Sequence, residues 1–440
     1  METNLRTKFL LVILLITQFS ISFSQALKSP FPFDFKGKML ISVSDADMVA
    51  SAYSDGKLGT PDGSDALSII KLDKPIRDLK AEEIGVSNSV TGPAISVAVT
   101  PNGRYAIVIE TRGSLPKGKS DVRLKDLEVG KMITVIDLIN PDKPTISQKI
   151  DGIEGFKNPQ AVSINAKGNL VAISFNPEKP ANQSPLVIYK FDEGKLSNPT
   201  TPVIPEWNLP DKLIVAEFHP TENLLCLLNL TKATVSFVTV EQKADSIQLM
   251  AWGNKVEMDK EPFKATFTPN GKFVLVNSLI MYGTVSVIKL GNLIDKNDTL
   301  KNELVSKATT SIYPEGLAIS PDGNWVVSTN LEMSWSALDD SKQGFFSSIS
   351  LLSFNQETGF LKHLRDFTFY GILPEASVFD NSSNFLAVTN FDHFDRSKSG
   401  GSIDFWRLSK DINDPTRVEM VKTNYSVPVT RGVHSLVIVR

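Results

Sequence analysis

Two glutamates, each directly after a proline, occupy matching places in a repeated strand pattern. They are Glu315, after Pro314, and Glu375, after Pro374. Two carboxyl groups in one partly buried place push each other's pKa values apart, which suits them to general acid and base work. The structural alternative is that they cap loops or bind channel water. Glu315 and Glu375 are therefore candidate catalytic residues.

Imidazole and guanidinium side chains accompany this pair. Arg431 and His434 lie at the start of the last strand pattern, and His393 follows the pattern that ends at Asn390. A histidine can pass a proton to or from a reacting group. An arginine binds a carboxylate or a phosphate through two parallel hydrogen bonds. His434 and His393 are candidate catalytic acids, and Arg431 is a candidate substrate-binding residue.

Five further polar residues lie at strand ends or starts. Glu110, Arg112, Asn330 and Asn390 end or follow second strands of the repeat, and Gln160 begins an inner strand. Asparagine at a strand end is more often a turn residue that bonds its own backbone than a ligand contact. All five are nevertheless kept as candidates for substrate binding.

No cofactor is firmly implied by the sequence. A divalent cation held by Asp392, His393 and Glu375 is kept as an option, because carboxylate and imidazole groups are common metal ligands. The sequence has no GxSxG, HExxH, CxxCH, P-loop or dinucleotide-binding motif.

A repeated hairpin pattern positions the candidate residues. The stretch 313–330, YPEGLAISPDGNWVVSTN, has two alternating apolar runs around a Pro-Asp-Gly turn, which predicts a tight β-hairpin. Similar phrases, such as VAVTPNGRYAIVIE from Val97 and TFTPNGKFVLVNS from Thr266, recur at a period of roughly 50 to 60 residues. A third strand and a less regular fourth follow each hairpin. Four short strands in each unit indicate a propeller blade.

Six complete blades can be found in this way, and the two ends of the chain supply a seventh. GKMLISVS from Gly37 and ALSIIKL from Ala66 match second and third strands, and VHSLVIV, residues 433–439, supplies the missing first strand. Closing the ring in this way removes open sheet edges. The predicted fold is an all-β, seven-bladed β-propeller over residues 35–440, closed by pairing of the C-terminal strand with the N-terminal blade.

In such a ring, the starts of inner strands and the ends of second strands converge on one mouth of the central channel. The loops there are long in four blades, over residues 44–64, 111–131, 331–344 and 391–400. Long loops on a rigid scaffold commonly carry binding residues. The equivalent positions at the inner-strand starts are expected to be Ile95, Gln160, Ile214, Phe263, Glu315, Glu375 and Val433. His219 and His363 are expected at the solvated surface.

Composition and the N-terminus suggest partners and location. With 46 basic and 49 acidic residues the net charge is −3, which argues against nucleic acid as a partner. Arg6 and Lys8 precede the apolar run 9–16 and a small polar stretch, which predicts a signal peptide over residues 1–25. That run is too short to span a hydrocarbon core of ~30 Å. We expect a secreted or periplasmic monomer with no membrane span after signal removal, stable without a disulfide because Cys226 is the only cysteine.

The phrases SPDGNWVVSTN, PNGKFVLVN and PNGRYAIVIE resemble the seven-bladed propellers of the lactonase and YVTN-repeat families over roughly residues 35–440. These families include phosphogluconolactonases, carboxymuconate lactonizing enzymes and secreted surface-layer proteins. The enzymes commonly have Pro-Arg-His at the start of an inner strand and Asn-Glu at the end of a second strand. In this chain the segments read Pro314-Glu315-Gly316 and Asn330-Leu331-Glu332, and only His434 keeps an inward histidine. The resemblance therefore implies the fold more directly than the reaction.

We expect an exported, lactonase-like enzyme that binds a small polar or anionic, sugar-derived or lactone-type molecule at the channel mouth. Glu315 or Glu375 would act as general base, directly or through water, and His434 or His393 as acid. Arg112 or Arg431 would neutralise a carboxylate or the developing oxyanion. Two alternatives stay open: a lyase acting on uronate-containing saccharides, and a noncatalytic scaffold that binds protein or glycan through its long loops.

Overall fold

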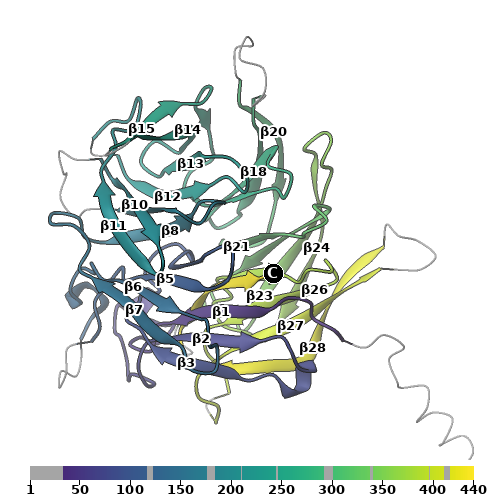
Figure 1. Cartoon of the computed structure of the whole chain (residues 1–440). Coiled ribbons are helices and arrows are strands. Elements are labelled where there is room, and N and C mark those ends of the chain that lie inside the picture. Colours follow the sequence, from purple (N-terminus) through teal and green to yellow (C-terminus); the bar gives the residue numbers. More distant parts are fainter. Residues whose placement is uncertain are drawn as a thin grey trace, which may run out of the picture. The chain divides into compact units, whose positions relative to one another are not determined.

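The structure is a computed structural model that describes residues 33–115, 122–175, 184–209, 211–243, 246–291, 301–336, 340–395, 397–410 and 417–440. Residues Phe35–Arg440 form one compact unit. The predicted signal peptide lies outside the described residues. Within the described part of the chain the strands form seven antiparallel sheets, the blades of a propeller (Figure 1).

The strands of each blade follow one another from the central channel outward. The first blade contains β29 (Val433–Val439), β1 (Met39–Ser44), β2 (Ala66–Lys71) and β3 (Ala81–Gly85). The second contains β4 (Val97–Val99), β5 (Tyr105–Ile109), β6 (Ile133–Asp137) and β7 (Thr145–Ile150). The third contains β8 (Pro159–Ile164), β9 (Leu170–Phe175), β10 (Leu186–Asp192) and β11 (Lys195–Thr200). The fourth contains β12 (Leu213–Phe218), β13 (Leu224–Asn229), β14 (Thr234–Lys243) and β15 (Ser246–Ala251), with the short β16 (Val256–Glu257) also paired to β14.

The remaining three blades follow the same order. The fifth contains β17 (Pro262–Phe267), β18 (Phe273–Ser278), β19 (Thr284–Lys289) and β20 (Glu303–Thr309). The sixth contains β21 (Pro314–Ile319), β22 (Trp325–Asn330), β23 (Ser347–Phe354) and β24 (Leu361–Phe369). The seventh contains β25 (Ser377–Phe379), β26 (Phe385–Asn390), β27 (Gly401–Lys410) and β28 (Val418–Val429). Among the described residues, three short helices lie in loops: α2 (Ala52–Asp55) and the 3-10 turns η1 (Ile76–Asp78) and η2 (Leu124–Asp126). Of the helices described, none has the length and apolar character needed to cross a membrane.

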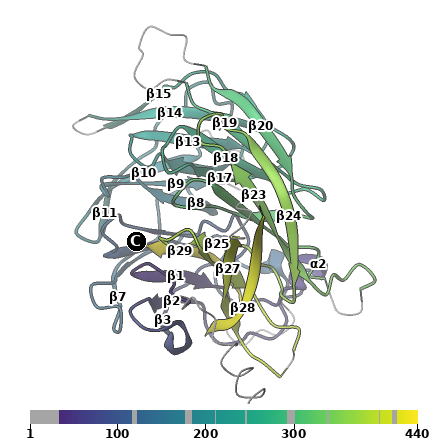
Figure 2. The same ribbon diagram turned by 90° about the vertical axis from the view of Figure 1, so that its right-hand side faces the viewer.

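The two ends of the propeller close the ring, as the sequence predicts. Strand β29 pairs antiparallel with β1, with Ile438 opposite Leu40 and Leu436 opposite Ser42 (Figures 1 and 2). Each of the seven inner strands contacts the next one around the channel, and β29 contacts both β25 and β4. The predicted all-β, seven-bladed fold with its closure by the C-terminal strand is therefore confirmed.

Apolar side chains fill the space between neighbouring blades. One cluster joins Ile107 and Val135 of the second blade to Val162, Ile173 and Val187 of the third. The alternation of apolar and small residues in the repeat supplies both faces of each sheet, because successive side chains of a strand point to opposite faces. The repeat thus builds a rigid ring that positions its loops.

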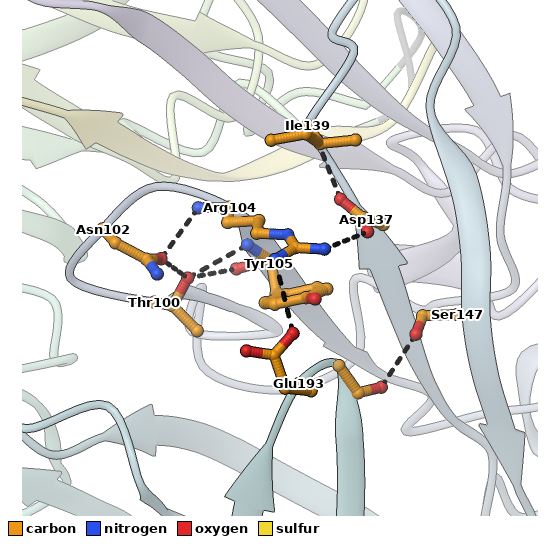
Figure 3. A network of polar contacts seen from close by, with 9 residues as sticks. Thr100, Asn102, Arg104, Tyr105, Asp137, Ile139, Ser147 and Glu193 are labelled. Carbon is orange, nitrogen blue, oxygen red and sulfur yellow. Dashed lines mark hydrogen bonds and ion pairs between the residues drawn. The ribbon is translucent and has the colours of Figure 1, made fainter.

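The hairpin turns opposite the mouth repeat one hydrogen-bond pattern. In the second blade the Thr100 hydroxyl donates to Asn102 Oδ1 (2.7 Å) and accepts from the Tyr105 amide (3.0 Å) (Figure 3). Arg104 lies 4.8 Å from the Tyr105 ring centre and is 3.4 Å from both Asp137 and, in the third blade, Glu193. Because Arg104 and both acids are partly exposed, these ion pairs contribute little energy and serve mainly to align the two blades.

His219 differs from its expected place at the surface. It is 2% exposed, and its Nε2 lies 2.9 Å from the carbonyl oxygen of Gly271 in the next blade. Its Nδ1 accepts hydrogen bonds from the amides of Thr221 and Glu222. The ring therefore links two hairpin turns, a contact that the single-hairpin pattern cannot reveal. His363 is partly exposed and lies 2.8 Å from Asp366.

We expect Gly271→Ala to destabilise the protein by about 2–4 kcal/mol. Gly271 has φ +69°, and a Cβ there would lie 2.3 Å from His219 Nε2. Gly56→Ala is the matched control, because Gly56 has φ +72° but no atom within 4 Å of the added Cβ. Chemical denaturation should show a smaller loss for Gly56→Ala. Equal losses would mean that backbone strain alone acts, without a contribution from the His219 contact.

Candidate functional site

Five inner strands carry a β-bulge at the mouth end of the blade. In each of them one residue is skipped in the pairing with the adjacent second strand. These residues are Gln160, Ile214, Phe263, Glu315 and His434. A bulge bends the strand and redirects its side chain. The bulges therefore determine which side chains face the mouth end of the central channel.

Glu315 and Glu375 occupy equivalent positions in the sixth and seventh blades. The amide after Glu315, that of Gly316, donates to Thr329 Oγ1 (3.1 Å), and the amide after Glu375, that of Ala376, donates to Thr389 Oγ1 (3.0 Å). In the closing blade the bulge residue is His434 rather than the expected Val433. That strand lacks the proline that directly precedes the bulge residue in β8, β17 and β21, so the one-residue shift is hidden in the sequence.

The structure brings the two glutamates together and buries them. Glu375 is fully buried, Glu315 is 6% exposed, and neither Glu375 oxygen has a hydrogen-bond partner among the described residues. Burial raises the pKa of Glu315 to about 8, opposed by the positive charge of Lys264. Burial, followed by the charges of Glu315 and Asp45, raises the pKa of Glu375 well above its usual range. Both carboxyl groups are therefore mainly protonated at neutral pH.

Loops of four neighbouring blades pack into an apolar cluster, called the cap below, on the mouth side of the ring. These loops follow strands β1, β3, β5, β22 and β26, and one further loop precedes β25. The buried members of the cap are Met48, Ala50, Ala52, Leu58, Val90, Leu127, Leu331, Ile372, Leu373 and Phe391. The sequence predicts that the glutamates face a common mouth, whereas in the structure this side of the mouth is filled by packed loops.

Tyr53, in α2 of the first-blade loop, joins the cap to the buried acids. Its hydroxyl donates to the carbonyl oxygen of Val90 (3.0 Å). Burial of this hydroxyl, followed by the negative charges of Glu375, Glu315 and Asp45, raises the Tyr53 pKa well above its usual range. The residue as a whole is 39% exposed. Tyr53 is therefore reached by solvent, while its hydroxyl is influenced by the charges of the glutamate pair.

His434 is fully buried, and both of its ring nitrogens have neighbours. Asn88 donates its amide hydrogens to the carbonyl oxygens of Ser44 and Val86, so its Oδ1 accepts from His434 Nε2 (2.8 Å). His434 Nδ1 lies 3.3 Å from the Ser435 hydroxyl. Burial lowers the pKa of His434 to about 3. The ring is therefore neutral near pH 7, and its catalytic role stays a prediction.

Arg431 and Glu110 hold loops in place. The Arg431 guanidinium donates to the carbonyl oxygens of Ala46 (3.0 Å) and Thr60 (2.7 Å), which anchors the first-blade loop. Glu110 accepts from the Ser87 hydroxyl (2.6 Å) and from the amides of Lys131 and Met132 (3.2 and 3.3 Å). These contacts give both residues a structural task, and their substrate-binding roles stay predictions.

Asn330 and Asn390 also make local contacts. Asn330 is fully buried; it donates to the hydroxyls of Ser348 (2.9 Å) and Ser350 (3.0 Å) and accepts from Ser328 (3.1 Å). Asn390 accepts the amide of Ile372 (2.8 Å), which fixes a backbone segment of the cap. These bonds show how the strand-end asparagines shape the mouth.

Arg112 and Gln160 meet at an open pocket of about 540 Å³, called the mouth pocket below, beside the cap. Loops of the first, second and third blades form it. Its lining residues are Ala52, Tyr53, Gly56, Thr91, Arg112, Arg123, Leu124, Lys125, Asn158 and Gln160. Gln160 and Asn158 are buried, and the Gln160 amide nitrogen donates to Asn158 Oδ1 (2.8 Å). No carboxylate or imidazole is among these lining residues, so the pocket is cationic.

Three lining residues, Arg123, Lys125 and Tyr53, are not indicated by the repeat pattern of the sequence. Arg123 directly precedes the short turn η2, and Lys125 lies within it. The Arg123 amide donates to Asp126 Oδ2 (3.2 Å). An isolated bridge pairs Lys57 of the first-blade loop with Arg123 of the second-blade loop, and a second bridge, between Arg112 and Val129, closes the second-blade loop on itself. The basic run RLK within a long loop was the available signal for the two cations.

His393 lines a separate, smaller pocket of about 190 Å³ together with Asp392, Ser336 and Trp335. The His393 amide donates to Asp392 Oδ1 (2.7 Å). Glu375 is not among the residues that line it. The cation site suggested for Asp392, His393 and Glu375 stays a prediction without added support.

Three aspartates of the first blade form a group that the repeat pattern of the sequence also does not indicate. The carboxylate oxygens of Asp45, Asp47 and Asp65 lie within 4.8 Å of one another, a spacing that could hold a cation. Burial, with the charges of Asp45 and Asp47, raises the pKa of Asp65 to about 9, and burial raises that of Asp45 to about 6. They also accept backbone amides, including those of Ala46 and Val90. Two aspartates separated by one residue after a strand were the available signal.

Comparisons with known proteins support the fold. No family model and no curated protein matches this sequence. Among solved structures, the periplasmic gluconolactonase PpgL of Pseudomonas aeruginosa is similar, with a TM-score of 0.57 and 15% identity over 91% of this chain and 99% of that one. A Bacteroides uniformis protein provisionally named a 6-phosphogluconolactonase has a TM-score of 0.58 and 13% identity over 92% and 100%. A functionally unknown protein from Desulfotomaculum acetoxidans gives 0.57 and 14% over 92% and 99%. The chain thus shares its seven-bladed propeller fold with these three structures.

Proposed function

We propose that this chain is an exported, lactonase-like hydrolase whose mouth pocket binds a small sugar acid or its lactone. The observation that carries the proposal is the set of three cations, Arg112, Arg123 and Lys125, around one open pocket. Cationic side chains bind carboxylate and phosphate groups through charge-assisted hydrogen bonds. Two similar propellers named for gluconolactone substrates support this substrate class. The periplasmic location in the name of one of them supports export.

In lactone hydrolysis, water attacks the carbonyl carbon, the ring C–O bond breaks, and the alkoxide takes up a proton. The cations of the mouth pocket would hold the acidic end of the substrate and offset the oxyanion charge. Tyr53 would lie against the substrate, since it lines this pocket. Glu315 or Glu375 would act behind Tyr53, through water, as the proton acceptor. Because the pKa of Glu315 is raised to about 8, hydrolysis that depends on ionised Glu315 should rise with pH through about 8.

Binding without turnover is the second candidate, and the absence of an acid from the mouth-pocket lining favours it. Glu315→Gln separates the two. The hydrolase predicts loss of lactone consumption in a pH-stat assay, with gluconate binding retained. A binding protein would bind gluconate in both the wild type and Glu315→Gln, and neither would consume lactone faster than the uncatalysed rate. The lyase alternative stays open as a prediction for uronate substrates.

We expect calorimetry to detect binding of 6-phosphogluconate and, more weakly, gluconate, with no binding of glucose. An Arg123→Ala, Lys125→Ala double variant should weaken the binding of both acids by about tenfold or more, because each charge-assisted bond contributes roughly 1.5–3 kcal/mol. The control is Lys195→Ala with Lys272→Ala, two exposed lysines outside the mouth pocket that change the net charge equally. Equal weakening in both double variants, or no binding of either acid, would contradict the proposal.

A further inference from the structure

A second cavity of about 300 Å³ lies within the central channel and shares no lining residue with the mouth pocket. Its walls come from the inner strands β4, β8, β12, β17 and β29 and from residues just before β4. It extends from Ile95, near the mouth end, to Val99 and Val437, further along the same strands. At about 30 Å³ for each water molecule, it has room for roughly ten waters.

Two oppositely charged side chains face this cavity from neighbouring blades. Glu217 interrupts the apolar strand β12, and Lys264 follows the bulge of β17. Both are half-buried. Within the described part of the chain, neither side chain makes a hydrogen bond, and they do not form an ion pair with each other. Their charges do interact, because each shifts the pKa of the other toward its charged form, against the effect of burial.

A charged group taken out of bulk water is costly unless it finds a partner. Two of the cavity's three hydroxyl groups are already used, since Ser163 donates to the Ala216 carbonyl oxygen (2.7 Å) and Ser435 Oγ accepts the Ser96 amide (3.1 Å). Glu217 and Lys264 are therefore the main polar groups available to a molecule in the cavity. The rest of the wall is largely apolar, including Ile164 and Leu436.

We infer that the channel cavity binds a zwitterionic amino acid with an apolar side chain. The ligand carboxylate would bind the Lys264 ammonium, the ligand ammonium would bind the Glu217 carboxylate, and the side chain would lie against the apolar wall. A leucine-sized molecule matches the room available. A neutral sugar would add no counter-charge to either group, and a simple acid or a simple amine would add one to only one of them. This ligand differs in class and in place from the sugar acid proposed for the mouth pocket.

Isothermal titration of the full-length protein with L-leucine tests this inference. We expect 4-methylpentanoate, which lacks the ammonium, and isopentylamine, which lacks the carboxylate, to bind at least about tenfold more weakly than leucine. Glu217→Gln and Lys264→Met should each weaken the binding of leucine by at least about tenfold. Glu217→Gln keeps the shape of the side chain, so it tests the charge even if Lys264→Met fails to fold.

The Arg123→Ala, Lys125→Ala variant provides the cross-control, because it alters only the mouth pocket. It should bind leucine like the wild type, and Glu217→Gln should bind gluconate like the wild type, so the two proposals can fail separately. The inference is overturned if leucine does not bind, if 4-methylpentanoate or isopentylamine binds as tightly as leucine, or if Glu217→Gln leaves leucine affinity unchanged.

Discussion

Replacing both Glu315 and Glu375 by glutamine is expected to stabilise the protein at alkaline pH. The folded state holds protons on these buried carboxyl groups, since burial raises the pKa of Glu315 from 4.5 to about 8 and raises that of Glu375 well above its usual range. The unfolded chain releases both protons above about pH 4.5. Because the folded state binds more protons, the free energy of unfolding falls as pH rises. For Glu315 this loss is complete only above about pH 8 and amounts to a few kcal/mol.

Urea denaturation from pH 6.5 to 9 checks this expectation. In this range the folded and unfolded forms of His434 are both largely neutral, because its pKa falls from 6.5 to about 3 on folding and its destabilising effect arises at more acidic pH. The double glutamine variant should show a flatter pH dependence than the wild type. The matched control is Glu241→Gln at an exposed position of β14, which should leave the slope unchanged. An unchanged slope in the double variant would contradict the buried, protonated state of the pair.

Removal of residues 433–440 is expected to abolish cooperative folding. This segment is the inner strand of the first blade; it pairs with β1 along its length and contacts β25 and β4. Without it, the pairing edge of β1 and the apolar groups of Met39, Ile41 and Val43 are uncovered. A propeller without its closing strand has an open sheet edge, which favours aggregation.

Size-exclusion chromatography and thermal unfolding distinguish the outcomes. The truncated chain should be aggregated or should lack a sharp transition. The control is Arg440→Ala, which removes hydrogen bonds to Asn381 and to the Phe379 carbonyl oxygen and should cost only about 1–2 kcal/mol. A truncated chain that stays monomeric and melts at the wild-type temperature would show that ring closure is not required.

The sequence predicts the blades well because each hairpin is encoded locally. In the sixth blade, the alternation from Trp325 onward and the Pro-Asp-Gly turn before it reproduce strand β22 to within one residue. The closing strand, residues 433–439, matches β29 in full. Period-two alternation and turn residues are short-range signals, and the repeat provides several independent copies of them.

The site is less visible in the sequence, because its features depend on contacts between blades. The cap joins loops that have no regular apolar period, so Met48, Leu127 and Phe391 carry no signal of their shared cluster. The mouth pocket likewise arises where Arg112, Arg123 and Gln160 of two blades meet. Sequence spacing indicated Arg112 and Gln160 as single residues. Alignment of the repeats predicts the inward pair Glu315 and Glu375, but it does not predict the burial that governs their protonation.

The Arg431 anchor sets an order of events during synthesis. Arg431 holds Ala46 across 385 positions of sequence and also holds Thr60, so it fixes the loop that carries Tyr53 and Gly56. The ribosome produces that loop long before Arg431 emerges, since translation adds roughly 5–20 residues per second. The wall of the mouth pocket should therefore become ordered only after the C-terminal segment that carries Arg431 is available. A nascent chain stalled before Arg431 would display its blades without a competent ligand pocket.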